Sequence, residues 1–201
     1  VDMALLKKVR ETSMMFFNLP EETKRKYELQ TMAGQRGYVS FGREVAKGSD
    51  APDLKEFYHI GDVDHKEGFT SAANVYPDEI SEEWSKSFRD LSTQCFLSMK
   101  IVAHAVLEAS AFALDLPKNT FAGSLEGGDS LLRLLHYPPI PEGSNPNSIR
   151  AGAHGDINLV TILAPVSETG LEIQHEGEWM AVQPPKDHLV IDAADMLEHW
   201  T

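Results

Sequence analysis

Two side chains that can bind a metal ion stand two positions apart in Ala153-His154-Gly155-Asp156. We predict a strand over residues 153–163, and on a strand residues two positions apart face the same side. His154 and Asp156 would then present an imidazole and a carboxylate together, which is two thirds of the facial triad that holds non-haem Fe(II). Such a triplet also arises by chance, and the alternative interpretation is a surface hydrogen bond between the two side chains.

The elements that would position these residues change character at Asp129. Apolar residues at helical spacing predict helices over residues 1–29, 81–116 and 118–125, with a new turn beginning at Pro20. Beyond Asp129 a period of two predicts short strands over residues 130–137, 153–163, 170–173, 178–182 and 188–191, with a hairpin turn at 174–177. We therefore predict an α+β fold in which a mainly helical region, residues 1–128, packs on a partial jelly roll, residues 129–201.

Two further details of this fold can be tested. A strand is predicted at residues 56–60 (Glu56–Ile60), which could be an edge strand. The long helix should bury a stripe made of Trp84, Phe88, Leu91, Cys95, Met99, Val102, Val106 and Ala109. Because a jelly roll needs about eight strands and about five are predicted, the core is expected to be incomplete at its C-terminal end.

Composition narrows the classes of function. The chain has 201 residues, of which 42% are hydrophobic and 24% charged, and its formal net charge is −13. An acidic surface repels phosphate backbones and anionic lipids, and no uninterrupted apolar run approaches the roughly 18 residues of a membrane span. We therefore expect no nucleic-acid or membrane partner. A single cysteine, Cys95, excludes an internal disulfide and favours a cytoplasmic location.

Several motifs occur along the chain in an order that resembles the isopenicillin-N-synthase-like branch of the Fe(II)/2-oxoglutarate-dependent oxygenases, in a bacterial-type form. They are Phe16–Pro20, Arg36–Tyr38, Asp53–Phe57, Arg133–Pro139, His154–Asp156, Gly170–Ile173, Gly177–Trp179 and Asp195–Thr201. The resemblance implies a double-stranded β-helix core, Fe(II) and O2 as cofactors, and 2-oxoglutarate as cosubstrate. A small organic substrate would be hydroxylated, desaturated or cyclised, with release of succinate and CO2.

The resemblance also assigns roles to individual residues. His154 and Asp156 would be metal ligands, and no other catalytic residue is implied. Tyr137 would donate its hydroxyl to a 2-oxoglutarate carboxylate, unless it is only a core aromatic at a strand end. Arg133, on the same strand face, would join it or pair instead with Asp129 or Glu172, since an inward arginine needs a carboxylate. Leu135 stands where plant relatives usually have asparagine. The resemblance also implies that Phe57, Tyr58 and His59 line the substrate pocket, unless they only form an edge strand.

The family's third metal ligand is a histidine roughly fifty to sixty residues after the aspartate, which falls beyond Thr201. His175, His188 and His199 follow Asp156 too closely, and we expect none of them to be the ligand. The arginine that pairs with the distal carboxylate of 2-oxoglutarate would come later still. We therefore expect a longer reading frame at both ends, unpartnered strands after Ala193, and no activity from the 201 residues alone. The alternatives are a 2-oxoglutarate-independent iron oxidase and a non-catalytic jelly-roll fragment.

Overall fold

The computed structural model describes residues 1–29, 34–45, 51–63, 73–126, 128–165 and 168–201, and is mixed α+β. The chain forms two compact units, residues 1–154 and 155–201. This division falls between His154 and Gly155, inside the triplet that the sequence singles out. The domain boundary at residues 128/129 stays a prediction.

The N-terminal helices follow local rules. Helix α1 (Met3–Phe17) begins at Asp2, whose carboxylate accepts a hydrogen bond from the Ala4 amide at 2.8 Å. Pro20 cannot continue a helix and opens the short helix α2 (Glu21–Lys24), which runs into a 3-10 turn, η1 (Arg25–Tyr27). The predicted helical region over residues 1–29 is thus present, in three pieces.

Helix α3 (Glu82–Ala113) confirms the long helix, and the Ser81 hydroxyl caps its start by accepting from the Trp84 amide at 3.1 Å. Three of the eight predicted stripe residues, Trp84, Phe88 and Cys95, are buried, and Leu91, Met99, Val102, Val106 and Ala109 are not. The buried residues of α3 are Trp84, Phe88, Ser92, Cys95, Phe96, Ala103, Leu107 and Ala111. In the second half of the helix the buried positions lie one residue beyond the predicted Val102 and Val106, at Ala103 and Leu107.

Helix α3 is also both long and apolar on average. Its best 18-residue window has a mean hydropathy of 1.4, so α3 is the one helix in the described ranges that could cross a membrane by those two measures. The helix packs against α1 and against strand β3 (Leu131–His136) of the same unit. The window contains polar residues and is not an uninterrupted apolar run, so the expectation of no membrane partner stays a prediction.

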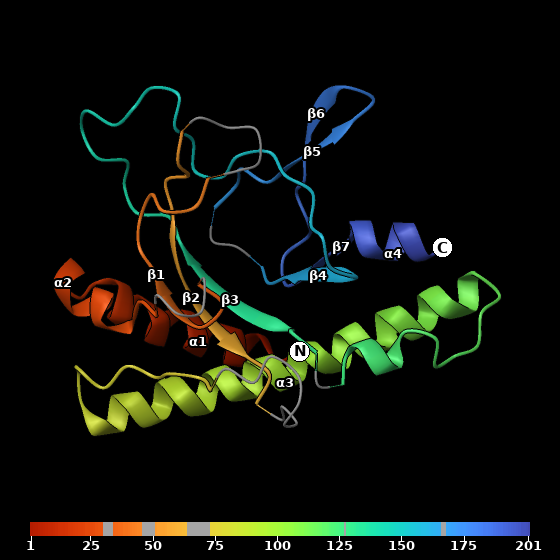
Figure 1. Ribbon diagram of the computed structural model, residues 1–201, viewed down its shortest axis with the longest axis horizontal. Coiled ribbons are helices and arrows are strands. Elements are labelled where there is room, and N and C mark those ends of the chain that lie inside the picture. The colour runs from red at the N-terminus through yellow and green to blue at the C-terminus, as the bar shows by residue number, and fades with distance from the viewer. Residues whose placement is uncertain (30–33, 46–50, 64–72, 127, 166–167) are drawn as a thin grey trace. The chain divides into compact units, whose positions relative to one another are not determined.

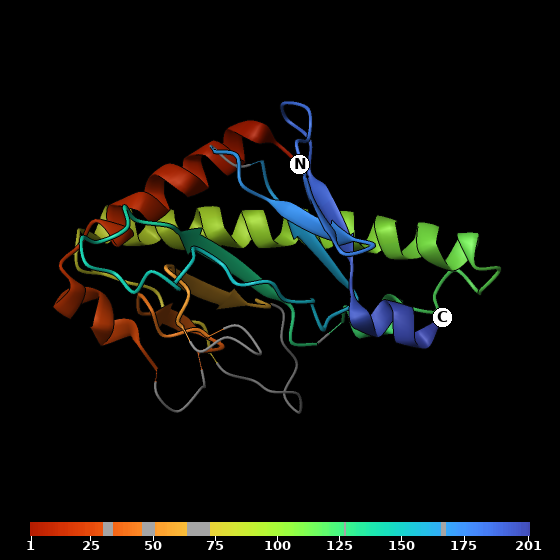
Figure 2. The same cartoon turned by 90° about the horizontal axis from the view of Figure 1, so that it is seen from above.

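The first unit contains a three-stranded antiparallel sheet in which strand β2 (Glu56–Gly61) lies between β1 (Gly37–Val39) and β3. Since β2 is central, the edge-strand alternative for residues 57–59 is wrong. Helices α1 and α3 lie together on one side of this sheet (Figures 1 and 2). The core on that side is aromatic and comprises Phe16, Phe17, Tyr27, Tyr38, Tyr58, Ile60, Trp84 and Phe88.

A polar cluster lies at the margin of this core. The buried Glu56 carboxylate accepts hydrogen bonds from Lys24 Nζ at 2.6 Å, from His136 Nδ1 at 2.7 Å and from the Tyr38 hydroxyl. The His136 ring is stacked on Phe17. Because an isolated buried charge is costly, these three donors are what allows Glu56 to stay ionised there.

The helix predicted over residues 118–125 is largely absent. Within that range the structure has turns and one 3-10 turn, η3 (Ala122–Ser124). The Thr120 amide donates to the Pro117 carbonyl, and the Ser124 amide to that of Phe121. Turns with hydrogen bonds between residues three positions apart therefore satisfy backbone groups of this segment, and a regular helix does not form.

The second unit consists of short strands and one short helix. Strand β4 (Val160–Leu163) pairs with β7 (Val190–Ala193), and β5 (Glu172–His175) pairs with β6 (Glu178–Ala181), in both cases antiparallel. The β5–β6 turn, Glu176-Gly177, has positive φ at both residues, as a two-residue type I′ hairpin requires. The predicted hairpin is confirmed.

Two predictions about this unit are wrong, for one physical reason. The segment 153–159 is not a strand, and the residues after Ala193 form helix α4 (Asp195–Trp200). The amides of Ala194, Asp195 and Met196 donate to the carbonyls of Leu159, Asp156 and Asn158. These hydrogen bonds form instead of strand pairing. The backbone amides of residues 194–196, which were expected to be unpaired, therefore have acceptors.

Candidate functional site

The face of the first unit's sheet that points away from the helices carries Arg133, whose β2 partner in the register is His59. The Arg133 Nε donates to His59 Nε2 at 2.7 Å, and its Nη1 lies 3.5 Å from Glu44 Oε1. The guanidinium also stacks over the Phe57 ring, with its carbon 4.5 Å from the ring centroid. As an alternative to a role with 2-oxoglutarate, Arg133 was expected to pair with Asp129 or Glu172, whereas the structure shows contacts with Glu44 and His59.

His59 is the side chain that holds Arg133 in place. Its Nδ1 donates to the Gly34 carbonyl at 2.6 Å, which leaves Nε2 with the lone pair that accepts from Arg133. Burial and, second, the Arg133 charge lower the pKa of His59 to about 4. The imidazole is therefore neutral near pH 7. The sequence predicted His59 as a pocket or edge-strand residue and not as a partner of Arg133, because the hydrogen bond between them joins residues 74 positions apart.

Tyr137 follows β3 directly. Tyr137 is 40% exposed to solvent, and its partial burial raises the pKa of its hydroxyl. The hydroxyl is therefore protonated near neutral pH and can donate a hydrogen bond. Arg150 Nη1 donates to the carbonyls of Tyr137 and Pro138, both at 3.2 Å, and this anchors the chain after the strand. Alternation along β3 exposes Arg133 and Leu135 on one face, as predicted.

A second group of charges lies in the same unit. Lys55 is bonded to Asp53 at 2.8 Å and to Glu44 at 2.5 Å, and the side chains of Lys55 and Asp53 are only 4% and 3% exposed. The Glu44 carboxylate therefore forms ion pairs with both Lys55 and Arg133. The sequence analysis identified the motif Asp53–Phe57 but gave its charged residues no role. The opposite charges of Asp53 and Lys55, two positions apart, were the sequence signal that could have predicted this ion pair.

His154 ends the first unit in an irregular segment. Its Nδ1 donates to the Gly152 carbonyl at 2.7 Å, since a carbonyl can only accept. In that tautomer the lone pair is on Nε2, and hydrogen bonding of one ring nitrogen to a backbone carbonyl is the usual arrangement of a metal-binding histidine. The side chain is exposed, so a ligand can reach it.

Asp156 lies in the second unit, where the Thr161 hydroxyl donates to its carboxylate and its carbonyl accepts from the Asp195 amide at 2.9 Å. A Cβ at Gly155 would stand 3.3 Å from Asp195 Oδ1, tighter than most contacts of that kind, so the glycine gives this turn its room. An imidazole nitrogen and a carboxylate oxygen are donors that Fe(II) prefers, so each of the two residues by its own chemistry suits the metal. Within the described ranges no group of three or more His, Cys, Asp or Glu side chains could hold a metal ion.

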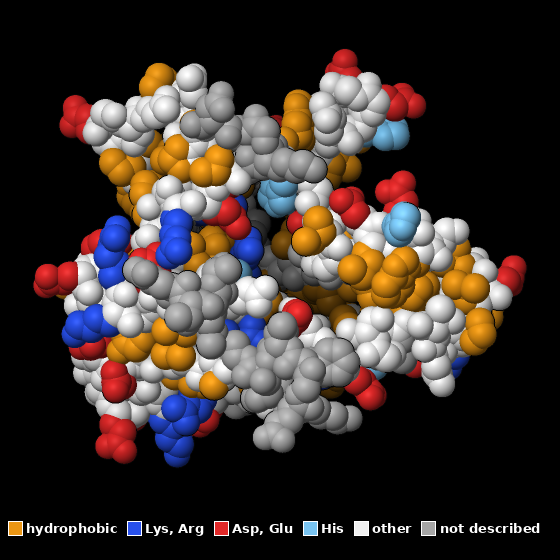
Figure 3. Space-filling view, in the orientation of Figure 1, with side chains coloured by type: hydrophobic (Ala, Val, Ile, Leu, Met, Phe, Trp, Pro, Cys, Tyr) orange, Lys and Arg blue, Asp and Glu red, His pale blue; other side chains and the backbone are white. Residues whose placement is uncertain are grey.

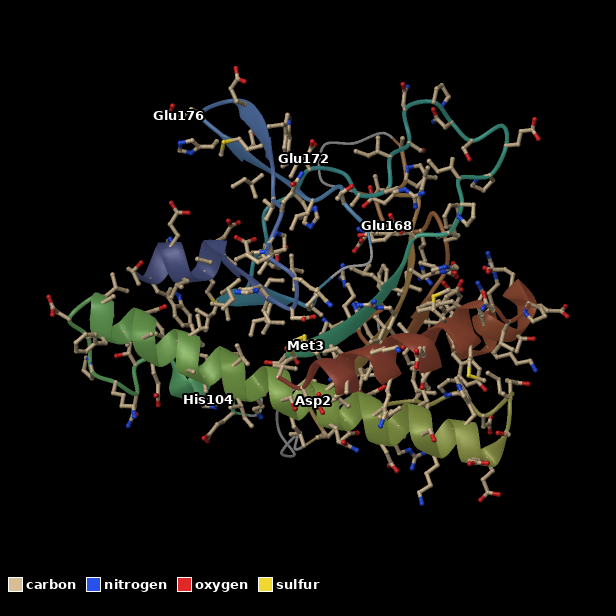
Figure 4. The ribbon with its side chains drawn as sticks, turned by 180° about the vertical axis from the view of Figure 1, so that it is seen from behind. Asp2, Met3, His104, Glu168, Glu172 and Glu176 are labelled. Carbon is tan, nitrogen blue, oxygen red and sulfur yellow. The ribbon has the colours of Figure 1, made fainter. Side chains whose placement is uncertain are left out.

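The other histidines of the second unit are placed differently. His175 pairs with Glu178 in the β5–β6 hairpin, where Figure 4 shows Glu172 and Glu176. His188 Nδ1 donates to the Lys186 carbonyl at 2.9 Å, and His199 lies on α4. That none of the three is the third ligand stays a prediction.

Two family models match the chain. Residues 1–79 match the model described as non-haem dioxygenase in morphine synthesis N-terminal, and residues 128–201 match the 2OG-Fe(II) oxygenase superfamily. The chain is thus similar to the 2OG-Fe(II) oxygenase superfamily over residues 128–201 and to the N-terminal region of non-haem dioxygenases over residues 1–79. The family uses Fe(II) and 2-oxoglutarate.

Solved structures and curated proteins agree with this family. The chain is 41% identical to a putative 2OG-Fe(II) oxygenase family protein from Caulobacter crescentus, with a TM-score of 0.81 over 98% of this chain and 63% of that one. It is 30% identical to a full-length Neurospora crassa protein solved in complex with alpha-KG (2-oxoglutarate) and thymine, with a TM-score of 0.82 over 100% and 63% of the two chains. The 2-oxoglutarate-dependent dioxygenase ecdK of Aspergillus rugulosus is 32% identical over 92% of this chain and 60% of its own length.

These matches support the predicted double-stranded β-helix architecture with N-terminal helices. The chain spans about three fifths of the length of the curated relatives it matches, with 60% and 57% of the first two covered.

Proposed function

We propose that this protein is an Fe(II)- and 2-oxoglutarate-dependent oxygenase that hydroxylates, desaturates or cyclises a small organic substrate, with release of succinate and CO2. The observation that carries the proposal is the orientation of His154, whose Nδ1–H is committed to the Gly152 carbonyl so that Nε2 is the nitrogen with metal-binding chemistry. We assign His154 and Asp156 as metal ligands. The chemistry that Fe(II) supplies when bound is activation of O2.

We assign the cosubstrate side to Tyr137 and Arg133. 2-Oxoglutarate is a dianion, and Lys186 is the single Lys or Arg among residues 155–201. Basic side chains gather instead over the first unit in the view of Figure 3. A protonated Tyr137 hydroxyl and the Arg133 guanidinium are donors of the kind that a carboxylate needs. We expect Arg133 to keep its contact with His59 while it does so.

The finer assignments belong to the same proposal. The 41% identity to the Caulobacter crescentus protein supports a bacterial-type member, and the order of the motifs supports the isopenicillin-N-synthase-like branch. Residues 129–201 are assigned to the jelly-roll domain. The lone Cys95, which is buried, supports a cytoplasmic location.

The test removes one proposed ligand in the protein expressed from its complete reading frame. Asp156→Ala should abolish Fe(II)-dependent release of succinate from 2-oxoglutarate and weaken anaerobic Mn(II) binding, while the melting temperature changes little because the side chain is not part of a core. Glu172→Ala is the matched control, since it removes an exposed carboxylate of the same unit. Undiminished succinate release in Asp156→Ala, or release by the wild type without Fe(II), would refute the proposal.

A further inference from the structure

The ion pair between Asp53 and Lys55 is buried outside the aromatic core of the first unit. Burying two charges costs several kcal/mol per ion before their attraction is counted, so a buried pair is weak evidence of a role in stability. Lys55 is also satisfied by Glu44 at 2.5 Å. Lys55 contacts Oδ2 of Asp53, and the contact made by Oδ1 suggests a role for the ion pair.

Asp53 Oδ1 accepts a hydrogen bond from the Gly152 amide at 2.9 Å, across 99 positions of sequence. Next to it, the Leu54 amide donates to the Ile149 carbonyl at 2.8 Å. A hydrogen bond to an ionised carboxylate is roughly twice as strong as one between neutral groups. These two bonds tie residues 149–152 to the segment that leads into β2.

Gly152 connects this anchor to His154. It is buried, and as a glycine it has no side chain to restrict its backbone dihedrals, so its hydrogen bonds must supply that restriction. Its amide is held by Asp53, and its carbonyl accepts from His154 Nδ1 at 2.7 Å. The direction of that carbonyl determines which imidazole tautomer is favoured.

We propose that Asp53 is a positioning residue for His154. Neutralised by Lys55, its carboxylate fixes the Gly152 backbone, and the Gly152 carbonyl then holds the imidazole with its lone pair on Nε2. The role of His154 as a metal ligand rests on the proposed function, whereas the link from Asp53 to the imidazole does not. Outer partners of this kind typically change metal affinity by about 10- to 100-fold when they are removed.

The test compares two isosteric substitutions in the full chain. Asp53→Asn has a single acceptor oxygen and cannot serve both Gly152 and Lys55. Asp62→Asn is the matched control, because Asp62 is also a buried aspartate of the same unit paired with a lysine, Lys100, at 2.7 Å. The two substitutions should cost similar stability. Asp53→Ala is a second variant with both acceptors removed.

Three readouts separate positioning from folding. In metal-free protein, hydrogen exchange of the Gly152 amide should accelerate about tenfold or more in Asp53→Asn, and the imidazole 15N shifts of His154 should change from the Nδ1–H tautomer to a mixture. The dissociation constant for Co(II) should rise about tenfold or more. In Asp62→Asn all three should stay at wild-type values.

Different failures have different meanings. Unchanged Gly152 exchange and an unchanged His154 tautomer in Asp53→Asn and Asp53→Ala would overturn the inference. So would equal effects in Asp62→Asn, which would show a general loss of structure. If the two NMR signatures change as expected but the wild type binds no Co(II), the link from Asp53 to His154 is supported and the proposed function is refuted.

Discussion

The hydrogen bond between His59 and Arg133 predicts how stability depends on pH. His59 is neutral in the folded protein because burial and the neighbouring guanidinium lower its pKa to about 4 from an ordinary value of 6.5. Between these two pH values the unfolded chain binds a proton at His59 that the folded protein does not. Stability therefore rises with pH in this window, is fully present above 6.5 and is lost as the pH falls towards 4.

The magnitude follows from the size of the shift. One pKa unit corresponds to about 1.4 kcal/mol, so a shift of this size gives roughly 3 kcal/mol in full. About 2 kcal/mol of it is lost between pH 7 and pH 4.5, before carboxylates begin to titrate strongly. For a domain of marginal stability this is a large fraction of the unfolding free energy.

The assay is urea unfolding followed by tryptophan fluorescence at half-unit steps from pH 7.5 to pH 4.5. We expect the unfolding free energy of His59→Gln, which cannot titrate, to fall by about 2 kcal/mol less than that of the wild type over this range. His175→Gln is the control, since His175 is an exposed histidine of the β5–β6 hairpin, and it should follow the wild type. Parallel curves for His59→Gln and wild type would refute the assignment of a neutral, buried imidazole that accepts from Arg133.

Two further substitutions test the cosubstrate assignment and the polar cluster. Tyr137→Phe should raise the 2-oxoglutarate concentration needed for half-maximal succinate release about tenfold, because one hydrogen bond worth roughly 1–1.5 kcal/mol is lost. An unchanged requirement would assign Tyr137 to packing. Lys24→Met leaves the buried Glu56 without its ammonium partner and should lower the unfolding free energy by about 3–5 kcal/mol in urea titrations at pH 7. A loss below about 1 kcal/mol would contradict the assignment of Lys24 as the partner that compensates the Glu56 charge.

Local chemistry made part of the fold predictable. The caps at Asp2 and Ser81, the break at Pro20 and the turn at Glu176-Gly177 each depend on residues within four positions of one another. Such features are set by backbone sterics and nearby hydrogen bonds, so they can be predicted without knowledge of the rest of the chain. The α+β order and the period-two strands after Asp129 follow from the same kind of pattern.

Other elements were decided by partners far away in sequence. Residues 153–159 have a strand-like pattern, yet carbonyls of this segment accept from the amides at the start of α4, so no strand forms there. In the second half of α3 the buried positions are Ala103 and Leu107 and not the predicted Val102 and Val106.

The candidate site divides in the same way. The residue types and spacing of His154 and Asp156 can be read from the sequence, and the resemblance to a family can be read from the order of the motifs along the chain. The partners that orient the site residues cannot be read from it, because the His59–Arg133 pair spans 74 positions and the Asp53–Gly152 bond spans 99. A hydrogen bond between such distant residues exists only after the chain has closed the loop between them, and therefore only the tertiary structure decides it.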